Sequence, residues 1–145
     1  MVTRRMDLEE LEKIDSKKMF KVYDIWPDIS KESYEQEFSK PEFSDIDHIV
    51  FAGMGGSGTI GDVFSSILSQ NDIHTSVVKG YLLPKTVDKN TLVVVTSESG
   101  NTQESLTIIE NSKNSQAKFI AFSSGGMIKE YASKNKINYQ EIKME

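Results

Sequence analysis

The spacing of apolar residues changes near residue 47, and this change divides the predicted structure in two. From Leu8 to Ile25, apolar positions recur at roughly helical spacing, after an Asp7 that can cap the first turn. Beyond residue 47, short apolar runs of strand type take over. Residues 1–42 are therefore expected to form a helical lead packed on a domain that follows it.

Proline and serine positions subdivide this lead. Pro27 is expected to end or bend the first helix, because proline has no N–H to donate and crowds the preceding turn. Ser30 is expected to cap a short second helix that runs to Phe38, and Pro41 to end it. The lead shows no residues arranged for chemistry.

The second part alternates strands with helices. Strands are predicted over 48–52, 73–78, 92–95, 119–122 and 137–142, and helices over 57–68, 101–111 and 127–134. Strands separated by helices of about a dozen residues indicate a parallel sheet with right-handed crossovers. The predicted fold of residues 43–145 is therefore α/β, a three-layer sandwich with a parallel sheet of flavodoxin-like or Rossmann-like type.

Each of these helices is expected to bury one apolar side against the sheet. The helix over 101–111 should bury Leu106 and Ile109. The helix over 57–68 should turn its large apolar side chains inward, namely Ile60, Val63, Phe64, Ile67 and Leu68.

The strand over 48–52 runs directly into a glycine turn, residues 53–58, which read Gly-Met-Gly-Gly-Ser-Gly. A helix that begins at such a turn presents unpaired N–H groups and the positive end of its dipole, which favour an anion such as phosphate. The turn also satisfies the dinucleotide pattern G-x-G-x-x-G, but the next strand ends in Lys79 without the acid that would hold a ribose. Nucleotide binding, and a turn needed only for close packing, stay open as alternatives.

A serine turn, residues 96–102, lies where a later strand meets a helix. Ser97 and Ser99 are two residues apart, so both hydroxyls can face one anion while Glu98 points away. Asn101 and Thr102 then open a helix and add N–H groups and another hydroxyl. The alternative is that Ser99 or Asn101 only caps the helix.

A third polar turn, residues 123–126, reads Ser-Ser-Gly-Gly and also follows a predicted strand. All three turns are therefore expected at the carboxyl edge of one parallel sheet. Ligands bind to such sheets at this edge, where the strand order reverses. The pattern predicts one anion site there, and no lysine follows the glycine turn as in nucleotide triphosphatases.

Composition narrows the class of partner. The formal net charge of −5 argues against nucleic acid, and no apolar run is long enough to span a membrane. The chain has no cysteine, which excludes disulfides and thiolate metal sites. No signal peptide is predicted, and the expected location is the cytoplasm.

The two main turns together resemble the SIS (sugar isomerase) domain, and within it the N-terminal half of bifunctional phosphoglucose/phosphomannose isomerases. The resemblance rests on the glycine turn with Gly61 and Asp62, on residues 97–104 (Ser-Glu-Ser-Gly-Asn-Thr-Gln-Glu), and on the neighbourhoods of Trp26 and residues 123–126. Where this chain has Glu98, that family usually has tyrosine. The resemblance implies phosphate binding by Ser57, Ser97, Ser99 and Thr102, and a substrate-binding loop of Gly55, Gly56, Gly58, Gly100 and Asn101.

The activity implied by the resemblance is interconversion of glucose 6-phosphate or mannose 6-phosphate with fructose 6-phosphate. It would pass through a cis-enediol without metal or organic cofactor, in a homodimer formed through SIS domains. The family's isomerases carry two SIS halves, and the second half supplies the glutamate, histidine and lysine that move protons and open the ring. This chain is therefore expected to be the phosphate-binding half of such an enzyme.

The chain itself offers no convincing acid or base. Its two histidines, His48 and His74, are predicted at the amino ends of strands, which is the wrong edge of the sheet. Asp62 is expected to be structural, and no catalytic residue is assigned. A non-catalytic sugar-phosphate sensor is therefore the alternative function, and a nucleotide-binding domain is the third.

Overall fold

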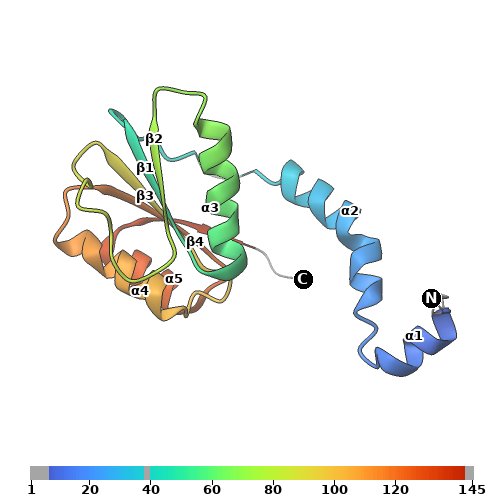
Figure 1. The fold of residues 1–145 in the computed structure, drawn as a ribbon. Coiled ribbons are helices and arrows are strands. Elements are labelled where there is room, and N and C mark those ends of the chain that lie inside the picture. The colour runs from blue at the N-terminus through green and yellow to red at the C-terminus, as the bar shows by residue number, and fades with distance from the viewer. Residues whose placement is uncertain (1–6, 38–39, 143–145) are drawn as a thin grey trace. The chain divides into compact units, whose positions relative to one another are not determined.

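The computed structural model describes residues 7–37 and 40–142 (Figure 1). The chain divides into two compact units, residues 1–38 and residues 39–145. The first unit is a pair of helices, and the second is an α/β domain.

The first unit holds α1 (Leu8–Ile14) and α2 (Phe20–Glu35). Asp7 caps α1 as predicted, since its carboxylate accepts a 2.8 Å hydrogen bond from the N–H of Glu10. The break between the helices falls at Asp15, whose carboxylate accepts a 2.9 Å hydrogen bond from the N–H of Phe20. Hydrogen bonds from the backbone of Met19 and Phe20 lower the pKa of the Asp15 carboxyl.

Pro27 does not end the helix, and the predicted cap at Ser30 is wrong, because α2 runs through both residues. Proline has no N–H, so α2 lacks one hydrogen bond at this turn. The side-chain cap that interrupts the lead comes earlier, at Asp15. The predicted helix end at Phe38 lies outside the described residues.

The second unit is a sheet of five parallel strands, in the order β2-β1-β3-β4-β5. α3 covers one face of the sheet, and α4 and α5 cover the other (Figure 1). The predicted α/β sandwich with a parallel sheet is confirmed, and every strand was predicted to within one residue at each end. The strands are β1 (His48–Ala52), β2 (His74–Val78), β3 (Thr91–Thr96), β4 (Lys118–Ser123) and β5 (Asn138–Glu141), and the helices are α3 (Gly55–Leu68), α4 (Gln103–Glu110) and α5 (Gly126–Asn135).

The two faces of the sheet are covered unequally. On the side of α4 and α5, alternate residues of the central strands are fully buried, and Leu106 and Ile109 of α4 pack there as predicted. On the side of α3, Phe51 and Val94 are only partly buried. This second face carries an apolar groove of about 410 Å³, lined by Phe43, Phe51, Ala52, Ser57, Ile60, Gly61, Phe64, Leu92, Val94, Thr96, Ile120, Phe122 and Ile142.

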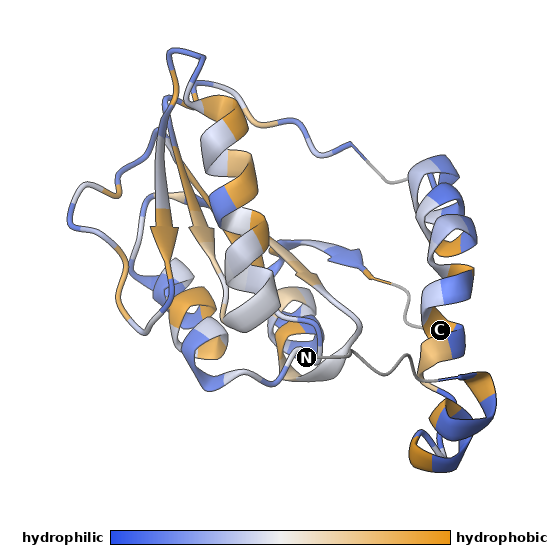
Figure 2. Ribbon diagram, turned by 45° about the vertical axis from the view of Figure 1, so that its right-hand side comes forward, coloured by the Kyte–Doolittle hydropathy of each residue, from blue (hydrophilic) through white to orange (hydrophobic). Residues whose placement is uncertain are grey.

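The predicted inner side of α3 is only partly correct: Leu68 is partly buried, and the ring of Phe64 stacks on that of Phe51 with centroids 5.8 Å apart. Gly58 and Gly61 are the buried residues of α3, and an added Cβ on Gly61 would lie 2.8 Å from the Cβ of Phe51. The small residues thus let the helix backbone approach the sheet. Four large apolar side chains of α3 stay 48–59% exposed, namely Ile60, Val63, Phe64 and Ile67. Figure 2 shows apolar residues recurring along the ribbon of this helix. Despite these apolar surfaces, none of the helices within the described ranges has the length and hydropathy to traverse a membrane.

Both histidines lie at the amino edge of the sheet, as predicted. His48 begins β1 and is 5% exposed, with Nε2 3.0 Å from the hydroxyl of Ser76 and Nδ1 3.3 Å from that of Thr91. The ring of His74 lies 4.7 Å away, centroid to centroid. Burial lowers the pKa of His48, and repulsion from His74 lowers it further.

Replacing Gly61 with alanine should destabilise the domain by about 1–3 kcal/mol, because the new methyl group meets a Cβ that cannot rotate away. Gly56→Ala is the matched control: it adds the same methyl group to the same helix, with nothing within 4 Å. Urea denaturation followed by circular dichroism measures both. Equal stabilities of the two variants would contradict the close approach of α3 to the sheet.

The free energy of unfolding should fall as the pH drops below about 6.5, the ordinary histidine value. Because the pKa of His48 is lowered in the folded state, the unfolded chain binds a proton that the folded chain resists. The stabilising effect is therefore present above that pH and lost below it. Urea titrations across this range should show a flatter dependence for His48→Gln, and an unchanged slope would count against this origin.

Candidate functional site

The glycine and serine turns lie side by side at the carboxyl edge of the sheet. β1 and β3 are neighbours, with Ala52 paired to Val95 at their ends. α3 leaves β1 toward one face, and α4 leaves β3 toward the other (Figure 1). The strand order reverses between these two strands, which is the position where ligands bind in such sheets. The predicted juxtaposition of the two turns is confirmed.

The glycine turn presents main-chain donors. Gly55 has φ +53°, and Met54, the residue that precedes α3, gives no side-chain cap. The first N–H groups of a helix have no intrahelical acceptor, so those at Gly55, Gly56 and Ser57 face out from the turn. An added Cβ on Gly55 or Gly56 would meet nothing within 4 Å, so the space in front of them is open.

Gly58 has a different role from its neighbours. It is buried, and an added Cβ would lie 2.7 Å from the carbonyl oxygen of Gly53. Packing alone thus explains Gly58, whereas it does not explain Gly55 and Gly56. The alternative that the glycines serve only close packing applies to one part of the turn.

The serine turn gathers hydroxyl groups at the start of α4. Ser97 is 2% exposed, and its hydroxyl donates a 3.0 Å hydrogen bond to that of Thr102. Ser99 is exposed, and its hydroxyl oxygen accepts from the N–H of Asn101 at 3.2 Å, which leaves its own proton available for a ligand. The residue that precedes α4 is Thr102, and it makes no side-chain cap bond. The alternative that Ser99 or Asn101 caps the helix is therefore wrong.

The third turn contacts the serine turn directly. Both the N–H and the hydroxyl of Ser124 donate to the carbonyl oxygen of Glu98, at 2.9 and 2.6 Å. The side-chain amide of Asn101 donates to the carbonyl oxygen of Ser99 at 3.0 Å and accepts from the N–H of Met127 at 3.1 Å. The Asn101 side chain thus joins two turns. The spacing of residues does not predict the contact between Asn101 and Met127, because they are 26 residues apart.

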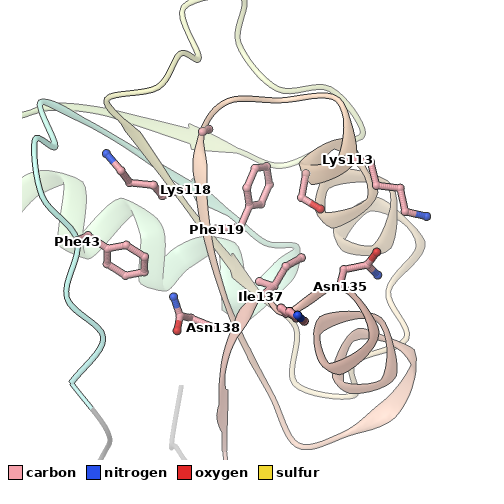
Figure 3. Close-up of a pocket in the computed structure, with 10 residues that line it drawn as sticks. Phe43, Lys113, Lys118, Phe119, Asn135, Ile137 and Asn138 are labelled. Atoms are coloured by element: carbon pink, nitrogen blue, oxygen red, sulfur yellow. The ribbon is translucent and has the colours of Figure 1, made fainter.

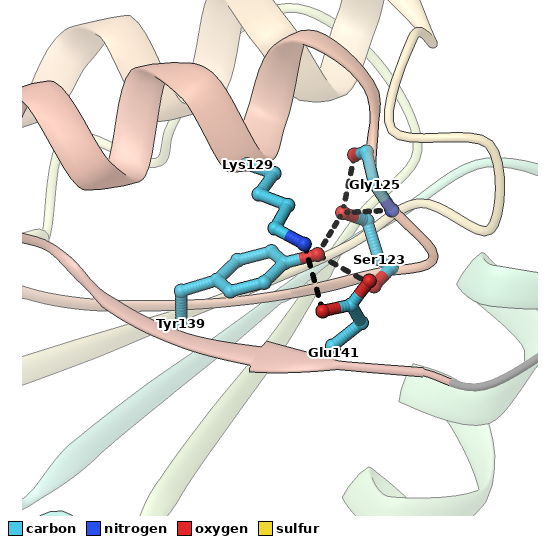
Figure 4. A network of polar contacts seen from close by, with 5 residues as sticks. All are labelled: Ser123, Gly125, Lys129, Tyr139 and Glu141. Carbon is cyan, nitrogen blue, oxygen red and sulfur yellow. Dashed lines mark hydrogen bonds and ion pairs between the residues drawn. The ribbon is translucent and has the colours of Figure 1, made fainter.

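A buried polar network holds the third turn from behind (Figure 4). Ser123 is fully buried, and its hydroxyl donates to the carbonyl oxygen of Gly125 at 2.8 Å. The same hydroxyl lies 3.1 Å from the hydroxyl of Tyr139. Nearby, Lys129 and Glu141 form a 2.8 Å ion pair, and this hydrogen bond raises the pKa of Lys129. Sequence analysis missed this network, which joins α5 to the last two strands.

Charged side chains near the turns are paired with one another. Asp62 in α3 forms a 2.6 Å ion pair with Lys79, at the end of β2, in agreement with the structural role expected for Asp62. Glu104, in the first turn of α4, raises the pKa of Tyr81 by charge repulsion and accepts a hydrogen bond from its hydroxyl. Lys79 is thus engaged by a carboxylate, and the two turns offer an anion neutral donors.

Another hollow, of about 360 Å³, lies at the amino edge beside β4 and β5 (Figure 3). Lys118 there donates to the carbonyl oxygens of Ser44 and Lys89, at 2.7 and 3.0 Å. The ammonium group of Lys113 lies 5.1 Å from the ring of Tyr131. Figure 3 shows the two lysines pointing in different directions, so their charges do not converge on one ligand.

Residues 42–136 match the family described as the SIS domain. The chain is 41% identical over 92 residues to a bifunctional phosphoglucose/phosphomannose isomerase of Caldicellulosiruptor bescii, covering 63% of this chain and 27% of the relative. It is 35% identical over 119 residues to the enzyme of the same name from Aquifex aeolicus, covering 81% of this chain and 34% of the relative. The chain thus spans about a third of the length of the curated relatives it matches.

Solved structures support the fold. Tagatose-6-phosphate ketose/aldose isomerase from Escherichia coli superposes with a TM-score of 0.53 at 20% identity, covering 70% of this chain and 30% of that one. The family match spans both the glycine and the serine turn, together with four of the five strands. The chain therefore belongs to the SIS domain family.

Proposed function

We propose that the glycine and serine turns together bind the phosphate group of a phosphorylated hexose. The observation that carries this proposal is the adjacency of two helix starts at the strand reversal, one with open glycines and one with three hydroxyl groups. Neither a packing turn nor a helix cap requires this combination. Phosphosugar isomerases among the relatives support a sugar phosphate as the ligand.

In this proposal the phosphate is held by neutral donors. The N–H groups at Gly55, Gly56 and Ser57 supply hydrogen bonds, and the dipoles of α3 and α4 favour the negative charge. The hydroxyls of Ser57, Ser97, Ser99 and Thr102 complete the set. Gly100 and Asn101 shape the turn, since Gly100 has φ +67° and the Asn101 side chain bonds to Ser99 within the turn and to Met127 at the start of α5.

We infer that the chain is the phosphate-binding part of an aldose–ketose isomerase that interconverts glucose 6-phosphate or mannose 6-phosphate with fructose 6-phosphate. The reaction needs a base that moves a proton between two carbons and a group that opens the ring. Both histidines lie at the opposite edge, so we assign these roles to residues of a second SIS domain. Pairing of SIS domains in a cytoplasmic homodimer is part of the same proposal.

A sugar-phosphate sensor without turnover is the second candidate. It is favoured by the state of the acidic residues described near the carboxyl edge. Glu98 is exposed, Glu104 is hydrogen-bonded to Tyr81, and Asp62 and Glu141 are ion-paired, so we assign none of them as a base. The two candidates share the phosphate site and differ only in turnover.

Replacing Ser99 with alanine should weaken the binding of fructose 6-phosphate about 10-fold to 100-fold, because a hydrogen bond to a charged group contributes about 1.5–3 kcal/mol. Calorimetric titration measures the change. Ser66→Ala is the control, since Ser66 is exposed on α3 away from the serine turn. Equal affinities in both variants would show that the serine turn does not hold the phosphate.

The chain should bind glucose 6-phosphate and fructose 6-phosphate but not NAD, and it should not interconvert the sugars by itself. The reason is that it has the phosphate donors without a base at the same edge. A dehydrogenase-coupled assay detects turnover, and titration with NAD tests the nucleotide alternative. Turnover by the chain alone would contradict the assignment of the base to a second domain, and tight NAD binding would contradict the sugar-phosphate site.

A further inference from the structure

The serine turn is held in place by the third turn. Four hydrogen bonds run from residues 124–128 to residues 98–101. Two go from Ser124 to the carbonyl oxygen of Glu98, and the others go from Met127 to Asn101 and from Ile128 to Gly100. All four donors belong to the third turn and the start of α5, and the three oxygens that accept from them belong to the serine turn.

The starts of the three helices at this edge are used in different ways. In α5 the N–H groups of Met127 and Ile128 are satisfied by the side chain of Asn101 and the carbonyl oxygen of Gly100. In α3 and α4 the preceding residues, Met54 and Thr102, make no side-chain cap bond. α5 therefore orders the serine turn, whereas α3 and α4 keep their first N–H groups available for an anion.

Steric contact between the two turns leaves little room for movement. An added Cβ on Gly100 would lie 1.9 Å from the carbonyl oxygen of Gly125. One on Gly126, which has φ +68°, would lie 2.5 Å from the carbonyl oxygen of Ser99. The backbones of the two turns thus touch without intervening side chains, so a displacement of one turn moves the other.

We propose that Ser124 is a positioning residue of the phosphate site, acting through the carbonyl oxygen of Glu98. Glu98 stands between Ser97 and Ser99, so holding its peptide group fixes the relative orientation of the two serine hydroxyls. This inference rests on the proposed function, because it concerns how the same phosphate is held. Ser124 itself does not touch the ligand.

The hydroxyl of Ser124 is suited to this role because it is one of two donors that hold the carbonyl oxygen of Glu98. The Glu98 and Ser99 side chains are exposed, so no side-chain packing adds to these hydrogen bonds and to the backbone contact between the turns. The hydroxyl bond, at 2.6 Å, is shorter than the N–H bond to the same oxygen, at 2.9 Å. Removing the hydroxyl leaves the N–H bond in place, so the fold survives while the peptide gains freedom.

Titration with inorganic phosphate and with fructose 6-phosphate, followed by ¹⁵N NMR of the full chain, tests the proposal. Ser124→Ala should weaken both ligands about 3-fold to 10-fold, which corresponds to the loss of one ordinary hydrogen bond. The amide signals of residues 97–102 should shift or broaden in the ligand-free variant. Ser124→Thr keeps the hydroxyl and should restore affinity.

Ser69→Ala is the matched control. The Ser69 hydroxyl also donates a 2.6 Å hydrogen bond to a carbonyl oxygen, that of Ser66, but at the far end of α3. It should lose no phosphate affinity, even if thermal denaturation shows a similar small loss of stability in both variants. Loss of affinity in Ser124→Ala alone, with rescue by Ser124→Thr, supports a positioning role rather than a general effect on the fold.

Two other outcomes overturn the inference in distinguishable ways. If the unchanged chain binds phosphate and Ser124→Ala binds it equally well, the positioning role is wrong and the phosphate site stands. If the unchanged chain binds neither ligand while its NMR spectrum shows a folded domain, the proposed function fails, and the positioning role fails with it.

Discussion

The site depends on one constraint, the pairing of β1 with β3 while their helices leave toward opposite faces. The starts of α3 and α4, at Gly55 and Gln103, are thereby brought to one point although they lie far apart in sequence. Each start has backbone N–H groups without intrahelical partners, a necessary consequence of helix geometry. The fold thus creates a place of positive potential before any side chain is considered. The glycines then clear space at it, and the serines add hydroxyl groups.

Hydrogen bonds from α5 and the third turn hold the serine turn in position without contributing donors to the candidate site. α5 gives up its own N-terminal donors to the serine turn, and behind it Ser123 and Tyr139 share hydrogen bonds with the main chain. Polar groups that are satisfied in this way hold their neighbours in a defined geometry. At this edge of the sheet, the first N–H groups of α5 are therefore hydrogen-bonded within the protein, whereas those of α3 and α4 stay available for a ligand.

The spacing of apolar residues and the residue types in the turns predicted the fold well, because the central strands are largely apolar and each is followed by glycine or serine. These local signals failed where packing between distant segments decided the outcome. Large apolar residues of α3 were assigned to the core, but Gly58 and Gly61 face the sheet because a close backbone approach excludes bulk there. Pro27 was expected to end or bend a helix, but α2 continues through it, and the break between α1 and α2 falls at Asp15 instead.

For the candidate site, the sequence predicted that the glycine and serine turns lie together. It did not predict the hydrogen bonds that hold the serine turn in position. The partner of Ser124 lies 26 residues away, and no spacing rule links the two. Much of the donor set at the glycine turn belongs to the main chain, which every residue except proline carries. Main-chain donors do not depend on which side chains surround them, so substitutions around the glycine turn can change the neighbouring contacts while the N–H groups that face an anion stay in place.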